Sequence, residues 1–167
     1  MTSQWKDRGY YAGFSEHVAE SVQAFPEISV HKDIWSKTKP NTSANAHLTI
    51  KAVELAHGAD LSYRFANRVR HAFFSEAVDI SDQDILLSLA ENHSLDAQKI
   101  NQAIHDGNAI ALLMSDYQQA KKLAIKGSPS YVLNNGRQTL YGNVGYRVLR
   151  ANIEELLRNP SHEASWC

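Results

Sequence analysis

The part of this chain that could do chemistry lies between Ala120 and Gly142, where a helical pattern ends and Gly127, Ser128 and Pro129 follow. Proline cannot continue a helix, and it restricts the residue before it to an extended conformation. A proline that stands between a helix and a strand therefore indicates a fixed backbone turn. Such a turn presents main-chain N–H and C=O groups to a ligand.

Other residues with chemical potential are sparse. The single cysteine, Cys167, excludes a disulfide within the chain, and we interpret it as an unactivated terminal thiol or as a partner for an intermolecular disulfide. The eight histidines show no His-X3-His or Cys-His spacing, so we expect no metal site. Among them His47 stands out because it follows the loop around Pro40, although a hydrogen-bonded histidine on a helix face is the simpler interpretation.

Length and charge restrict the class of protein. A chain of 167 residues with a formal net charge of −1 suits one domain with a real core. It has no broad basic face for nucleic acid, no apolar run long enough to span a bilayer and no apolar segment of a secretory signal. We therefore expect a cytoplasmic protein without nucleic-acid or membrane partners.

The elements that must position the turn can be read from the spacing of apolar residues. Residues 10–25 have helical spacing, residues 28–35 alternate like a strand with one buried face, and residues 37–41 form a loop. Thr42 or Ser43 can then cap a helix.

Further helices follow before the turn. Asp60 can cap one helix, the sequence from Ser81 to Asp84 resembles a capping box, and Ser94 or Asp96 opens a short helix.

The last part of the chain predicts a helix over residues 107–125, with Gly127 as its C-cap. A hairpin is expected at residues 131–141, because Asn135 begins an Asn-Gly step, the strongest short-range hairpin signal. A final amphipathic helix is expected over residues 148–157.

The order of these elements and two of their motifs resemble the DsbA-like branch of the thioredoxin superfamily. The first motif is D-I-S-D-Q-D-I-L-L-S-L-A-E-N-H-S-L-D-A at residues 79–97, and the second is the stretch from Ala120 to Gly142. The resemblance covers residues 10–158. It implies an α/β, thioredoxin-like fold that an α-helical insertion interrupts.

In that fold, residues 10–41 and 125–158 would form the thioredoxin-like part, residues 42–124 the helical insertion, and residues 1–9 and 159–167 the tails. The usual first strand is missing, since residues 1–9 do not resemble a buried strand. Three interpretations stay open: a shortened form of a longer protein, a natural member that fills its sheet differently, and a second chain that supplies the missing edge.

The resemblance implies that the peptide bond before Pro129 is cis and that Pro129 faces the ligand. Ser128 and Ser130 would then supply main-chain groups that pair with a thiol-containing peptide or small molecule. The simpler alternative is a proline that only starts a strand.

One departure from the family pattern bears on activity. Disulfide-active relatives carry Cys-X-X-Cys at the start of the first helix, whose N-terminus lowers the thiol pKa. This sequence has no cysteine before Cys167, so no catalytic residue can be assigned. We expect a member of the thiol-disulfide oxidoreductase family without redox activity. The alternative is a non-catalytic module that binds a thiol-containing peptide or another partner.

A third interpretation is a glutathione-dependent transferase or isomerase, since kappa-class glutathione transferases and 2-hydroxychromene-2-carboxylate isomerases share this architecture. Those enzymes use a serine near the first helix and an Asp-Arg pair after the hairpin. Here Ser15 lies two turns into its helix, and Gly142 is followed by Asn143-Val144-Gly145. Asn143 could contact a ligand carboxylate or amine, or could be a loop asparagine in a left-handed turn. We therefore expect no cofactor, with glutathione as the alternative.

A missing strand would also leave edges unpaired. The strand at residues 28–35 and the hairpin at residues 131–141 would each lose a neighbour, and exposed edges invite pairing with another chain. We therefore expect self-association into a homo-oligomer, unless residues 1–9 fold back over the gap.

Overall fold

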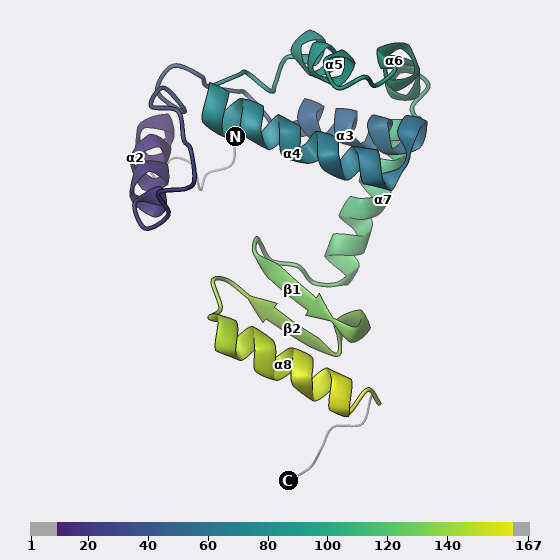
Figure 1. Ribbon diagram of the computed structural model, residues 1–167. Helices are drawn as coiled ribbons and strands as arrows, with labels where there is room; N and C mark the ends of the chain where they lie inside the picture. Colours follow the sequence, from purple (N-terminus) through teal and green to yellow (C-terminus); the bar gives the residue numbers. More distant parts are fainter. Residues whose placement is uncertain (1–9, 162–167) are drawn as a thin grey trace. The chain divides into compact units, whose positions relative to one another are not determined.

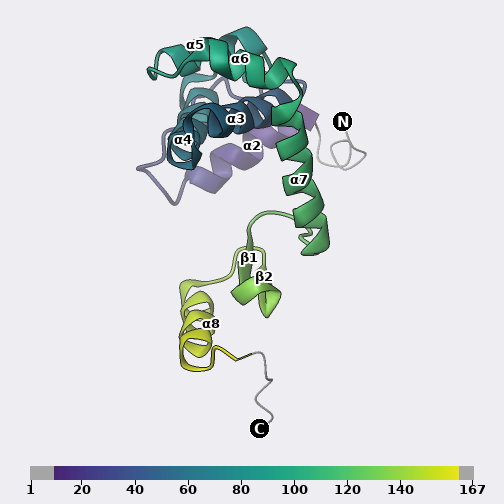
Figure 2. The same cartoon turned by 90° about the vertical axis from the view of Figure 1, so that its right-hand side faces the viewer.

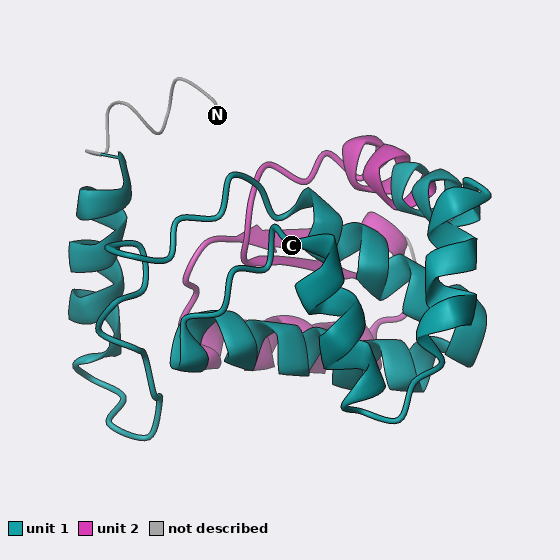
Figure 3. Cartoon of the chain, turned by 90° about the horizontal axis from the view of Figure 1, so that it is seen from above, with its two compact units in different colours: residues 1–114 teal, residues 115–167 magenta. Residues whose placement is uncertain are grey.

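The computed structural model describes residues 10–161. The chain divides into two compact units, residues 1–114 and residues 115–167 (Figure 3). The expectations for Cys167 and for residues 1–9 lie outside the described residues. No helix within residues 10–161 is both long and apolar enough to cross a membrane.

The first unit is built from helices. They are α2 (Tyr10–Val22), α3 (Ala44–His57), α4 (Ala59–Glu76), α5 (Gln83–Glu91), α6 (Ala97–His105) and the first part of α7 (Asn108–Lys122) (Figures 1 and 2). Helices α3 and α4 pack side by side, and α5 and α6 pack against this pair and against each other. The helical pattern of the sequence is therefore confirmed over this region.

One hydrophobic cluster holds α3 to α6 together. Its fully buried side chains include Phe65, Leu86 and Ile100. Full burial of such a side chain contributes about 1.5–3 kcal/mol. Buried Ser62 is satisfied as well, because its Oγ donates a hydrogen bond to the carbonyl of Ile50 at 2.8 Å and so joins α4 to α3.

The N-cap of helix α5 is Asp82, and the capping box predicted from Ser81 does not form. The Asp82 carboxylate accepts hydrogen bonds from the N–H of Asp84 at 2.9 Å and of Ile85 at 3.3 Å. Ser81 instead donates from Oγ to the carboxylate of Asp79 at 2.6 Å. The carboxylate one residue further on is the stronger acceptor, so it takes the cap.

Helix α6 begins at Asp96, one of the two predicted caps. Its carboxylate accepts from the N–H groups of Gln98 and Lys99, both at 3.1 Å. The hydrogen bond from the Lys99 N–H is the main reason that the pKa of Asp96 lies below its ordinary value.

The starts of the two long helices agree with the expectations only in part. Ser43 precedes α3 without a side-chain cap, whereas Thr42 Oγ1 accepts from the Ala44 N–H at 3.0 Å. Helix α4 is preceded by Gly58, and Asp60 lies inside its first turn.

Residues 28–35 do not form the predicted strand. They run through turns, and one isolated bridge pairs Ile34 with Thr38. The N–H of His31 donates to the carbonyl of Phe74 at 2.7 Å, which ties the segment to α4. Alternating polarity indicates one buried face, but a strand also needs a partner for its backbone groups, and the sheet of the described residues does not include this segment.

The second unit contains a hairpin and a helix. Strand β1 (Ser130–Leu133) pairs antiparallel with β2 (Gln138–Tyr141) through the short turn η1 (Asn134–Gly136). Helix α8 (Tyr146–Arg158) runs beside the hairpin (Figures 1 and 2). The predicted hairpin and last helix are confirmed.

Gly127 is not the C-cap of the preceding helix. Helix α7 ends at Lys122, and Ala124 takes the left-handed conformation with φ 52°. The N–H of Ile125 then donates to the carbonyl of Ala120 at 3.0 Å, which completes the helix end. Gly127 lies further along, in the turn itself.

Candidate functional site

The turn before the hairpin carries the candidate site. The peptide bond between Ser128 and Pro129 is cis, the geometry that the family resemblance implies. Both residues are exposed, and Ser130, the first residue of β1, is half-buried. The turn is therefore within reach of a ligand and directly continuous with a strand.

Two hydrogen bonds hold the turn in place. Ser130 donates from Oγ to the carbonyl of Gly127 at 2.5 Å, which closes the turn across Pro129. The N–H of Gly142 donates to the carbonyl of Pro129 at 2.9 Å, which attaches the turn to the end of β2. Gly142 has φ 87°, a conformation that favours glycine.

A close contact adds to these bonds. A Cβ atom at Gly127 would lie 2.8 Å from the hydroxyl oxygen of Tyr141, the last residue of β2. The absence of a side chain at Gly127 thus lets the tyrosine ring lie against the turn. The roles of Gly127 and Tyr141 are not visible in the sequence, since a glycine near a helix end resembles a C-cap and an exposed strand tyrosine carries no distinguishing signal.

The main-chain groups of this region are only partly used. The Gly142–Pro129 bond marks these residues as a bonded pair, and bonded pairs alternate along an antiparallel ladder. The N–H and C=O groups of Ser130 and Val132 therefore face away from β2. Those of Ser128 make no hydrogen bond to any described residue. The sheet of the described residues contains β1 and β2 only, so the groups of Ser130 and Val132 form one open edge, and Ser128 lies just before its start.

Asn143 lies next to Gly142, and the Gly142–Pro129 bond brings it to the same end of the hairpin as Ser128 and Ser130. Its side chain is exposed, and it makes no hydrogen bond to a described residue. The structure thus places all the predicted binding residues at one end of the hairpin.

The chemistry available at this place is hydrogen bonding. Ser128, Pro129, Ser130 and Asn143 are uncharged, and residues 10–161 contain no cysteine. The described residues also contain no group of three or more histidine, cysteine, aspartate or glutamate side chains that could hold a metal ion. Ser15 lies inside α2 and not at the start of a helix.

The sequence is similar to one protein family and to a set of adapter proteins. A thioredoxin family model matches residues 9–149. The ClpXP adapter protein SpxH of Halalkalibacterium halodurans is 28% identical over 160 residues, which cover 90% of this chain and 52% of that protein. The chain spans about half the length, or less, of the curated relatives it matches.

Solved structures resemble the chain at lower identity. A candidate protein disulfide isomerase from Nitrosomonas europaea has a TM-score of 0.71 at 15% identity, and the match covers 96% of this chain and 78% of that one. The cytosolic disulfide reductase DsbM of Pseudomonas aeruginosa has a TM-score of 0.62 at 22% identity, with 87% and 78% covered. DsbM has also been solved with GSH, in a form that matches with a TM-score of 0.57 at 19% identity.

Proposed function

The chain belongs to the thioredoxin family and has a thioredoxin-like fold of the DsbA-like type, and from this premise we propose that it is a non-catalytic module that binds partner proteins. The open edge formed by Ser130 and Val132, with Ser128 just before it, carries this proposal. The adapter name of the SpxH relatives supports it, because an adapter works by binding.

The mode of binding follows from the direction of the free main-chain groups. An extended peptide segment that adds to β1 would exchange hydrogen bonds with Ser128, Ser130 and Val132, as in strand addition to other sheet edges. Each such bond contributes a net of about 0.5–1.5 kcal/mol, so several are needed for useful affinity. Asn143 would contact the end of the bound segment.

Thiol chemistry is not part of this proposal. A thiol-disulfide oxidoreductase cycles between a dithiol and a disulfide, and this sequence contains one cysteine, Cys167. A thiol-containing peptide would therefore bind here as a ligand and leave unchanged.

Glutathione is the second candidate ligand. It is a short thiol peptide, and the structure of DsbM with GSH supports its consideration. The amide of Asn143 could contact a carboxylate or the amine of glutathione, in place of the Asp-Arg pair expected in glutathione-dependent relatives.

The domain assignment and the location remain part of the proposal. Helices α3 to α7 occupy residues 44–122, which supports an insertion at residues 42–124 between thioredoxin-like parts at 10–41 and 125–158. We further propose a cytoplasmic location, and the cytosolic DsbM neighbour supports it.

Peptides selected from a random library against the chain would test the binding mode. Substitution of Ser128 by proline removes one free N–H and should weaken a selected peptide about twofold to tenfold. Ser128→Ala keeps every main-chain group and is the matched control, so it should bind like the unchanged protein.

Methylation of the peptide provides an independent check. Because groups that face one edge alternate along a strand, N-methylation of alternate peptide amides should abolish binding, and N-methylation of the intervening amides should not. Equal affinities for the two Ser128 variants, together with indifference to methylation, would reject pairing at this edge. Saturable glutathione binding in the absence of any peptide binding would favour the second candidate.

A further inference from the structure

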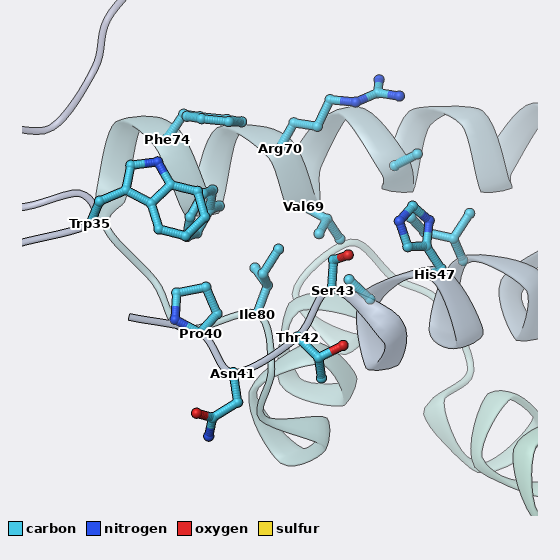
Figure 4. Close-up of a pocket in the computed structure, with 14 residues that line it drawn as sticks. Trp35, Pro40, Asn41, Thr42, Ser43, His47, Val69, Arg70, Phe74 and Ile80 are labelled. Atoms are coloured by element: carbon cyan, nitrogen blue, oxygen red, sulfur yellow. The ribbon is translucent and has the colours of Figure 1, made fainter. Parts of the chain in front are cut away.

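A cavity of about 460 Å³ lies in the first unit, between the start of α3 and the second half of α4 (Figure 4). Its walls are mainly apolar and include Trp35, Val69, Phe73, Phe74 and Ile80. Small-molecule sites typically have volumes of roughly 300–1,000 Å³, with apolar walls and a few polar groups. The cavity has the size and the lining of such a site.

The indole of Trp35 is fixed as one wall of this cavity. Trp35 has φ 63°, which is rare for a bulky residue, and its main-chain N–H donates to the carbonyl of Thr38 at 3.1 Å. Its ring packs edge-on against Phe73 with centroids 4.9 Å apart and stacks on Tyr11 at 5.9 Å. Neighbouring contacts thus maintain an unusual backbone conformation, a combination that is frequent at ligand sites.

The polar part of the cavity lining contains a cationic side chain and no anionic one. It consists of Asn41, Thr42, Ser43, His47 and Arg70, and none of the described lining residues is an aspartate or glutamate. Figure 4 shows His47 beside the cavity on α3, and Arg70 extending outward from α4. The Arg70 side chain therefore brings one positive charge to the edge of the cavity, here called its mouth, and no carboxylate of the described lining opposes it.

The positive charge of Arg70 is not neutralised within the described residues. Its Nη1 donates to the uncharged side-chain oxygen of Asn67 at 2.8 Å. Glu76, the carboxylate at the end of the same helix, instead accepts from Arg68 at 2.8 Å and lies 2.9 Å from His71 Nδ1. The hydrogen bond from Arg68 is the main reason that the pKa of Glu76 lies below its ordinary value, so Glu76 is ionised and already paired.

We propose that this cavity binds a small-molecule carboxylic acid with an aryl or alkyl body. The body lies against Trp35 and Phe74, where its apolar surface leaves water. The carboxylate stays at the mouth, near the imidazole of His47 and within the field of Arg70. The site belongs to the first unit and is independent of the peptide edge proposed for the second.

Two ligands of equal shape and opposite charge test this inference. Titration calorimetry with 4-phenylbutyrate and with 4-phenylbutylamine compares the same body with a carboxylate and with an ammonium group. The acid should bind saturably, and the amine about twofold to tenfold more weakly, since the exposed charge of Arg70 attracts the carboxylate and repels the ammonium group by up to about 1 kcal/mol each. Equal affinity for the acid and the amine, or no binding of the acid, would overturn the proposal.

Substitutions at the mouth identify the site. Arg70→Gln should weaken the acid about twofold to fivefold. Arg64→Gln is the matched control, because it removes the same charge from an exposed position of α4 outside the cavity lining. His47→Asp places a negative charge at the mouth and should weaken the acid by a similar factor; an acidic residue in the first turn of α3 does not disfavour the helix.

Filling the cavity is the last arm of the experiment. Ala66→Phe introduces a ring into the lining and should abolish binding while circular dichroism stays unchanged. Retained affinity in a folded Ala66→Phe variant would place the ligand elsewhere. An equal loss in Arg64→Gln and Arg70→Gln would show attraction to the whole helix surface and would also overturn the proposal. If Ala66→Phe does not fold, the variants at Arg70, Arg64 and His47 still show whether the acid binds at this cavity.

Discussion

The side chain of Tyr141 lies against the Cα of Gly127: a Cβ atom there would be 2.8 Å from the tyrosine hydroxyl and 3.2 Å from its ring. The contact crosses the turn that contains Pro129, so it couples the end of β2 to the segment that enters β1. Tyr141 is 59% exposed, so one part of its side chain contacts the turn and the rest contacts solvent. The position of the proposed binding turn therefore depends on a side chain in the neighbouring strand.

Replacement of Gly127 by alanine should move the Tyr141 ring away from the turn. Because the exposed ring can swing outward, we expect a loss in unfolding free energy of about 1 kcal/mol and a clear loss of peptide affinity. Urea denaturation and peptide titration would measure the two effects.

The double variant Gly127→Ala with Tyr141→Ala should show a coupling energy, because the clash needs both side chains. Gly145→Ala is the control, since a Cβ there meets nothing within 4 Å. If Gly127→Ala behaves like Gly145→Ala in both measurements, the contact has no role in positioning the turn.

The Asp96 cap predicts a specific dependence on pH. Its folded pKa lies below the ordinary value of 3.8, so the carboxylate stabilises the fold above that value, and this stabilisation is lost as the pH falls through the lowered pKa. Asp96→Asn keeps an N-cap acceptor but cannot titrate. The Tm of the unchanged protein should therefore fall more steeply than that of Asp96→Asn between pH 5 and pH 2. Parallel Tm curves would contradict this account, and Asp96→Ala should be less stable at every pH.

The sequence predicted the elements whose evidence is local. Asp96 as a cap, the Asn-Gly step at Asn135 and the helical spacing before it depend on neighbouring residues, and the structure agrees. The prediction of a strand at residues 28–35 was wrong, because alternating polarity indicates only a buried face, while the backbone partner of a strand comes from a distant part of the sequence. Gly127 was misassigned for a related reason, since its contact with Tyr141 crosses the hairpin.

The binding turn could be predicted from the sequence and the cavity could not, because only the turn is built from neighbouring residues. Ser128, Pro129 and Ser130 are consecutive, so their pattern is visible in the sequence. The cavity joins Trp35 and His47 to residues of α4, and each of these side chains taken alone resembles an ordinary core or surface residue. Trp35 gave no sequence signal for its positive φ, because that conformation depends on packing.

The helical cluster should be far more sensitive to truncation than α8. Leu86 is fully buried, so Leu86→Ala should cost about 2–5 kcal/mol through lost burial and a residual cavity. Leu157 on α8 is 77% exposed, and Leu157→Ala should change stability by less than about 0.5 kcal/mol. Chemical denaturation measures both, and similar effects would mean that Leu157 is covered in solution.

The chain should show no turnover as a disulfide reductase. A single cysteine, Cys167, cannot form and reopen a disulfide within the chain, so disulfide-bonded insulin mixed with dithiothreitol should not precipitate faster with the protein than without it. Activity above background that persists in Cys167→Ser would contradict the non-catalytic proposal. Activity that disappears in Cys167→Ser would point to exchange between chains.

The open edge of β1 also predicts self-association, now without the segment at 28–35, which forms no strand. Val132 presents its N–H and C=O away from β2, and exposed groups of this kind pair with another copy of the chain. Val132→Pro removes the outward N–H but no bond to β2, so it should reduce association. Thr139→Ala, on the other strand, is the control and should leave association unchanged. Sedimentation equilibrium at tens of micromolar, where exposed edges begin to associate, measures both. A monomer at that concentration would show that the edge is covered in solution.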